Sequence, residues 1–149
     1  MIDDIDRQIL TILQGDGRTA TAEIARRLNM APSAIFERIK KLEASGVIQG
    51  YHAQLDAKSL GLGLLAYVFV RSDDKVGESS AGERLAEIPE VLEVHHIAGE
   101  DCFLVKVRAP DTETLGRLLR DRFGGIESIR STRTTIVLSS IKEGSTIPV

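Results

Sequence analysis

The chain has 149 residues, of which 42% are hydrophobic and 28% are charged, and its formal net charge is -3. This composition excludes a disordered or collagen-like chain and suits one fair hydrophobic core or two small ones. No apolar run reaches the roughly 18 to 20 residues of a membrane span, and the acidic start lacks the basic region of a signal peptide. With one cysteine, Cys102, no internal disulfide can form, so we expect a cytoplasmic protein.

The charges are distributed unevenly along the chain. Residues 1–60 contain eight basic and eight acidic side chains, whereas residues 61–149 contain eleven and fourteen. The basic residues of the first part gather at Arg26, Arg27, Arg38, Lys40 and Lys41. Phosphate binding depends on the charges at the interface and not on the net charge, so this local cluster is sufficient for contacts with nucleic acid.

Apolar residues at helical spacing predict three short helices in the first third of the chain. The first covers residues 3–14, and Thr21 is expected to cap a second helix over residues 22–28. Pro32 suits the first position of a third helix, which Gly46 ends. Three such helices joined by short turns are typical of a helix-turn-helix.

The third helix has a narrow apolar stripe and a polar, basic outer face. Small residues at its start, followed by long polar and basic ones, fit an approach to base edges and phosphates in the major groove. Arg38 is expected to point outward to DNA, with a solvated or internally paired arginine as the alternative. The second helix of such motifs crosses the DNA backbone, which makes Arg27 a candidate phosphate contact. The predicted DNA-binding residues are Ser33, Ala34, Glu37, Arg38, Lys41 and Arg27.

The rest of the chain alternates between strand and helix patterns. A run over residues 47–55 predicts a strand that forms a wing or leads into a linker. Strands are then predicted over 64–71, 91–98, 102–109 and 129–138, with helices over 78–87 and from Asp111 to Gly124. This βαββαβ order is that of ferredoxin-like domains. We therefore predict an α+β protein with a winged helix-turn-helix at 1–54, a linker at 55–63, a ferredoxin-like domain at 64–142 and a loosely held tail at 143–149.

The turn between the two middle strands of the second domain is the candidate ligand loop. The Gly99 backbone permits close approach, Glu100 or Asp101 can accept an ammonium group, and Thr132 and Thr134 lie on one face of the last strand. A plain hairpin turn with stabilising threonines is the alternative. The predicted ligand-binding residues are Gly99, Glu100, Asp101, Cys102, Thr132 and Thr134. No metal-ligand cluster, phosphate loop or nucleophile with a base is visible, so we expect no metal, no cofactor and no catalysis.

Taken together, these segments resemble the Lrp/AsnC, or feast/famine, transcription regulators. The resemblance extends from DDIDRQIL through GDGRTATAEIARRLNMAPSAIFERIKKLEASGVIQGY to AGEDCFLVKV and TRTTIVL. It implies double-stranded DNA as partner, a free amino acid as effector, and homodimers that assemble into octamers or other multimers. Two positions depart from the family. Ala31 stands where a serine commonly caps the recognition helix, and the aspartate that leucine-responsive members have at the position of Cys102 lies one residue earlier, at Asp101. A leucine effector therefore does not follow.

The sequence as a whole predicts a sequence-specific DNA-binding transcriptional regulator whose assembly or DNA affinity responds to a small effector. An architectural protein that wraps DNA without an effector is one alternative. A regulatory subunit of a metabolic enzyme is another, because small ferredoxin-like domains also occur there.

Overall fold

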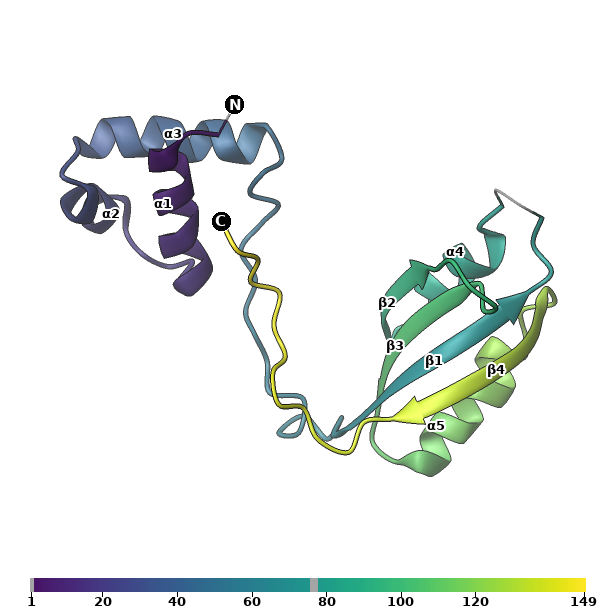
Figure 1. The fold of residues 1–149 in the computed structure, drawn as a ribbon. Coiled ribbons are helices and arrows are strands. Elements are labelled where there is room, and N and C mark those ends of the chain that lie inside the picture. The colour runs from purple at the N-terminus through teal and green to yellow at the C-terminus, as the bar shows by residue number, and fades with distance from the viewer. Residues whose placement is uncertain (1, 76–77) are drawn as a thin grey trace. The chain divides into compact units, whose positions relative to one another are not determined.

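In the computed structural model, which describes residues 2–75 and 78–149, the chain forms two compact units (Figure 1). The first comprises Met1–Gln54 together with Lys142–Val149, and the second comprises Leu55–Ile141. The C-terminal tail therefore belongs to the first unit. None of the described helices is long and apolar enough to cross a membrane.

Three helices form the first unit: α1 (Asp4–Gly15), α2 (Thr21–Leu28) and α3 (Pro32–Ala44). Each contributes a fully buried isoleucine to a shared core, namely Ile9, Ile24 and Ile35. At the start of α1, Asp3 and Asp6 exchange hydrogen bonds between side chain and backbone in a capping box. This satisfies N–H groups that have no partner inside the helix, so α1 begins firmly.

The starts of α2 and α3 are less firmly capped. The sequence had suggested Thr21 as the cap of α2, but Thr21 is the first residue of this helix. Ala20 holds the capping position without a side-chain hydrogen bond. Pro32 begins α3 as predicted, and Ala31 at the N-cap provides no side-chain hydrogen bond. The Asn29 backbone is in the left-handed region, with φ of 50°, and Asn29 ends α2. Its side chain makes no capping hydrogen bond to α3.

The strand predicted over residues 47–55 is not formed. The backbone N–H groups of Val47 and Ile48 both donate to the Leu42 carbonyl, at 3.0 and 3.1 Å, so this segment turns back against the end of α3. A strand needs a neighbouring strand for its backbone groups, and none lies beside this segment among the described residues. The segment leads into the linker, which was the second of the two possibilities.

The tail is held more firmly than expected. The Gln14 side chain of α1 donates from Nε2 to the Ile147 carbonyl at 3.0 Å, and its Oε1 accepts from the Ile147 backbone N–H at 2.9 Å. Both backbone groups of one tail residue are thus paired by a single amide side chain, which fixes the tail against α1.

The second unit is a four-stranded antiparallel sheet with helices. In chain order it contains β1 (Leu64–Ser72), α4 (Ser80–Ala86), β2 (Val91–His96), β3 (Phe103–Ala109), α5 (Thr112–Leu118), a π-helical turn η1 (Leu119–Phe123) and β4 (Ile129–Ile136). The strand order in the sheet is β2-β3-β1-β4. The predicted βαββαβ order is confirmed, with β2 ending at His96 and α4 beginning at Ser80, inside their predicted bounds.

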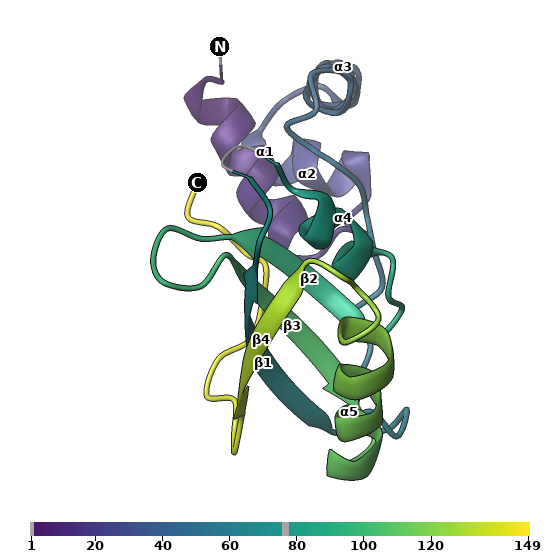
Figure 2. The same cartoon turned by 90° about the vertical axis from the view of Figure 1, so that its right-hand side faces the viewer.

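Both helices cover the same face of the sheet and leave the other face open (Figures 1 and 2). Val68, Val70 and Val105 point to the covered face, where they are fully buried in the core. Side chains alternate along a strand, so Phe69 and Leu104, which lie directly opposite each other, point to the open face. The candidate ligand loop joins β2 to β3 at one end of this sheet.

Candidate functional site

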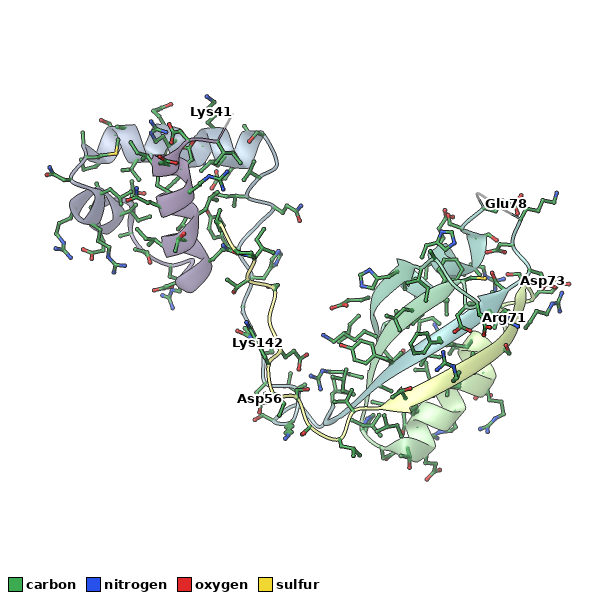
Figure 3. All side chains as sticks on the ribbon, viewed as in Figure 1. Lys41, Asp56, Arg71, Asp73, Glu78 and Lys142 are labelled. Carbon is green, nitrogen blue, oxygen red and sulfur yellow. The ribbon has the colours of Figure 1, made fainter. Side chains whose placement is uncertain are left out.

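The outer face of α3 carries most of the predicted DNA-binding residues. Ile35 and Leu42 are buried on the inner side, whereas Ser33, Glu37 and Lys41 are exposed and Ala34 is half-buried. Figure 3 shows the Lys41 side chain directed away from the three-helix unit. Lys41 makes no ion pair with another described residue, so its charge is available to a phosphate.

Arg38 does not point outward, which corrects the expectation from the sequence. Its Nη1 lies 2.7 Å from Asp3 Oδ2 and 2.7 Å from Asp6 Oδ1. Position 38 flanks the apolar stripe of α3 on the side that meets the start of α1, and the capping-box carboxylates are in reach there. The internally paired alternative is therefore the one that the structure contains.

The electrostatics of this contact favour the charged forms of both partners. A backbone hydrogen bond from Asp6 lowers the pKa of Asp3, and the Arg38 guanidinium lowers it further. The hydrogen bonds to Asp3 and Asp6 raise the pKa of Arg38. Arg38 thus joins α3 to the start of α1.

Arg27 is exposed on α2 but is shared with an acidic neighbour. Its Nε lies 2.7 Å from Glu23 Oε1, and the same carboxylate pairs with Arg26 at 2.7 Å. These two arginines lower the pKa of Glu23 to about 2. The pairs are exposed and three or four residues apart on one helix, so they are weak, and Arg27 can exchange Glu23 for a phosphate at little cost.

The ligand loop is anchored to β1 and the end of β2. The Cys102 carbonyl accepts from the Ile97 N–H, and the Cys102 N–H donates to the Val70 carbonyl, both at 2.9 Å. Gly99 has a φ of +148°, a conformation that favours glycine. The Cys102 thiol is half-buried, with Sγ 3.4 Å from the Ser72 amide nitrogen, so Cys102 itself packs against β1.

Two arginines that were not predicted as site residues contact the rest of the loop. Arg71 Nε donates to the Glu100 carbonyl at 3.2 Å, and Arg133 Nη2 lies 3.0 Å from Asp101 Oδ2. The Arg133 guanidinium carbon also lies 4.2 Å from the centroid of the Phe69 ring. Figure 3 labels Arg71 at the end of β1. The signal for Arg133 was present in TRTT, because the residue between two threonines that share one face must point to the other face.

Thr132 and Thr134 share one face, as predicted, but it is not the face that carries Arg133. They pair directly with Val70 and Val68, whose side chains point to the helix-covered side. The Asp101 side chain of the loop contacts Arg133 on the open side instead. The structure therefore brings the loop and β4 together through Arg133, while the threonines line the edge strand on the opposite face.

Comparisons with known proteins agree with the division into a helix-turn-helix unit and a sheet-containing unit. A family profile described as Lrp/AsnC ligand binding domain matches residues 65–147, and a profile described as winged helix-turn-helix DNA-binding matches residues 2–49. The chain belongs to the Lrp/AsnC family. This Lrp/AsnC protein is 38% identical to the HTH-type transcriptional regulator FL11 of Pyrococcus horikoshii, over 99% of this chain and 97% of that protein.

Solved structures of other proteins match this Lrp/AsnC protein over 98% or more of its length. AsnC of E. coli aligns with a TM-score of 0.91 at 29% identity, covering 98% of each chain. The feast or famine regulatory protein of M. tuberculosis, in its complex with L-methionine, aligns with a TM-score of 0.91 at 33% identity, covering 100% of each chain. The predicted family and fold class are confirmed. The chain is a DNA-binding transcriptional regulator with an effector-binding domain, as predicted, and among the described residues no group of side chains could hold a metal ion.

Proposed function

We propose that this regulator assembles as a homo-oligomer, inserts α3 into the major groove of each operator half-site, and binds a free amino acid at the loop of residues 99–102. The observation that carries the proposal is that Arg71 and Arg133 both contact that loop, at Glu100 and at Asp101. An amino acid needs donors for its carboxylate and acceptors for its ammonium group, and this loop has both.

In the DNA-binding part of the proposal, each residue has a distinct role. Ser33, Ala34 and Glu37 approach base edges from the first two turns of α3, while Lys41 and Arg27 contact phosphates. Arg38 sets the angle of α3 through its two aspartates and is not itself assigned to DNA.

Substitution of one cation tests the DNA-binding surface. Lys41→Ala should weaken binding to all DNA sequences and reduce the slope of log affinity against log salt by about 1, because one phosphate contact is lost. The matched control is Lys58→Ala, which removes an exposed lysine from the second unit. Equal salt slopes for both variants and the wild type, measured by fluorescence anisotropy on DNA upstream of the gene, would contradict the assignment.

For the effector, the two ends of an amino acid have separate partners at the loop. Glu100 is exposed, and no described residue forms an ion pair with its carboxylate, so it is suited to the ammonium group. Arg133 is 66% exposed despite its contact with Asp101, so it can turn to a carboxylate. The relative from M. tuberculosis was solved with L-methionine, which supports an amino acid of this kind.

We propose that Thr132 and Thr134 contribute to the effector site of a second subunit. They lie on edge strand β4, whose outer side has no neighbouring strand in the described sheet. We assign them to the rim of the effector site of an adjacent copy in the oligomer, together with the Gly99 and Cys102 backbone of that copy.

Calorimetric titration with each amino acid in turn tests the effector site. One amino acid should bind the wild type, with the affinity lost in Glu100→Gln and Arg133→Gln. Arg117→Gln is the matched control, because Arg117 is an exposed arginine on α5 of the same unit. If no amino acid binds and binding to unrelated DNA equals binding to the upstream DNA, the architectural alternative replaces the proposal.

Large apolar side chains of the second unit support the homo-oligomer. Leu138 is 98% exposed and Ile141 is 95% exposed, and Leu55 and Leu60 are also mostly exposed. Contact with another subunit would remove these apolar side chains from water, which favours association. Sedimentation equilibrium of Leu138→Asp should show a smaller assembly than the wild type, whereas Lys142→Asp, an exposed control in the first unit, should not; a monomeric wild type would refute the oligomer.

A further inference from the structure

Phe36 is the one large apolar side chain of α3 that is exposed, at 48% of its surface. The other large apolar residues of this helix, Ile35, Ile39 and Leu42, lie in or against the core of the first unit. An aromatic side chain left half in water forgoes much of the stabilisation that burial would give. Packing within the first unit therefore does not explain Phe36.

The neighbours of Phe36 place it on the side of α3 that carries polar and basic groups. Positions three and four apart are adjacent on a helix, so Ser33 and Lys40 flank Phe36 in one row. The Lys40 ammonium nitrogen lies 5.6 Å from the centroid of the Phe36 ring, and it is also 3.2 Å from Glu43 Oε2. A hydroxyl, an aromatic ring and a cation thus follow one another along the row.

This sequence of groups matches the chemistry of the major groove at a thymine. The C5-methyl group of thymine is the apolar feature that a base pair presents there, and apolar side chains contact it. The phosphates border the groove, within reach of a lysine beside such a ring. Two cations on the outer side of α3, Lys40 and Lys41, favour a polyanion over an apolar protein partner.

We propose that the Phe36 ring contacts the C5-methyl group of a thymine in each half-site, with Lys40 directed to the adjacent phosphate. The inference rests on the proposed entry of α3 into the major groove and makes Phe36 a determinant of sequence specificity. Phe36 replaces no role given above to Ser33, Ala34 or Glu37, because it lies on the flank of the same face.

Deoxyuridine tests the contact, because it lacks only the C5-methyl group of thymidine. The probe is the duplex that the wild-type protein enriches from a random-sequence DNA library, with each thymine in turn replaced by deoxyuridine. At one thymine of each half-site the wild type should lose about fourfold in affinity, which is the effect of one buried methyl group. Phe36→Ala should bind the unmodified duplex more weakly and show no further loss at that position.

Two further variants keep the test independent of folding. Phe36→Leu retains an apolar side chain and should retain part of the deoxyuridine effect. Val47→Ala truncates an apolar side chain that is 40% exposed outside α3, and it should keep the full effect. Circular dichroism of all variants compares their helix content.

The outcomes separate this inference from the function on which it rests. An enriched sequence whose binding is indifferent to every deoxyuridine, or a Phe36→Ala variant with the same deoxyuridine loss as the wild type, would overturn the role of Phe36 and leave the α3 assignment intact. If the wild type enriches no sequence from the library, the proposed sequence-specific binding fails, and the role of Phe36 fails with it.

Discussion

Arg38→Ala is the substitution that best separates a positioning role from a DNA contact. The two carboxylates that Arg38 meets are unequally sheltered, because the Asp6 side chain is 13% exposed and the Asp3 side chain is 52% exposed. A sheltered hydrogen bond between charged groups contributes roughly 1.5 kcal/mol, so we expect the bond to Asp6 to account for most of the effect and the exposed pair with Asp3 to add little. We therefore expect Arg38→Ala to destabilise the three-helix unit by roughly 1.5 kcal/mol.

Hydrogen–deuterium exchange read by mass spectrometry is suited to this measurement, because peptides from α1 and α3 report on the first unit separately from the sheet. Exchange in these helices should become faster in Arg38→Ala and stay unchanged in Lys41→Ala. A double-mutant cycle with Asp6→Asn should give a coupling energy of about 1 kcal/mol, as residues in direct contact are not additive.

DNA binding supplies the opposite readout. At a temperature where Arg38→Ala remains folded, the salt slope of its DNA affinity should equal that of the wild type, whereas Lys41→Ala reduces it by about 1. If Arg38→Ala instead leaves exchange unchanged and reduces the salt slope, Arg38 exchanges its aspartates for a phosphate, and the positioning role is refuted.

Three further substitutions test the structure by stability. Ala31→Ser should raise the free energy of unfolding by about 1 kcal/mol, because the extended N-cap of α3 has no side-chain hydrogen bond; an unchanged melting temperature would count against this. Gly82→Ala should lower it by about 1 to 3 kcal/mol, because the new Cβ would lie 2.6 Å from the Phe103 ring, and urea unfolding that matches the wild type would contradict the close packing. Glu23→Gln tests a charge whose pKa is lowered from 4.5 to about 2 by Arg26 and Arg27. The stabilisation by this charge is present above about pH 5 and is lost as the pH falls towards 2. The urea midpoints of variant and wild type should therefore differ at pH 7 and converge in acid, and a constant difference would exclude Glu23 as the source.

The local structure of this chain could be predicted well because it depends on near neighbours along the sequence. Pro32 began a helix and Gly46 ended one, since proline fixes φ and lacks an N–H, and Gly46 adopts a φ of +74°. Periodicity also gave the order of strands and helices in the second unit. The strand over residues 47–55 failed because alternation shows only that a segment can be extended, whereas a strand also requires a partner.

Contacts between residues far apart in the sequence could not be predicted from the sequence. Arg38 lies on the flank of the apolar stripe of α3. Its two partners are far away in the sequence, 35 positions for Asp3 and 32 for Asp6. Gln14 and Ile147 are 133 positions apart, so nothing local indicated that the tail is fixed to α1.

The sequence by itself determined the family, the three-helix unit, the βαββαβ order and the outward position of Lys41. These follow from periodicity, helix-ending residues and the angle between successive side chains on a helix. Only the tertiary structure decided which cations pair with an acidic residue of another element, because such pairing depends on distances between separate elements. It joined Arg38 to two aspartates, placed Arg71 and Arg133 at the ligand loop, and left Phe36 exposed beside Lys40. The charges available at the DNA-binding face of α3 and at the ligand loop therefore depend on packing between elements. No single segment of the chain contains that information.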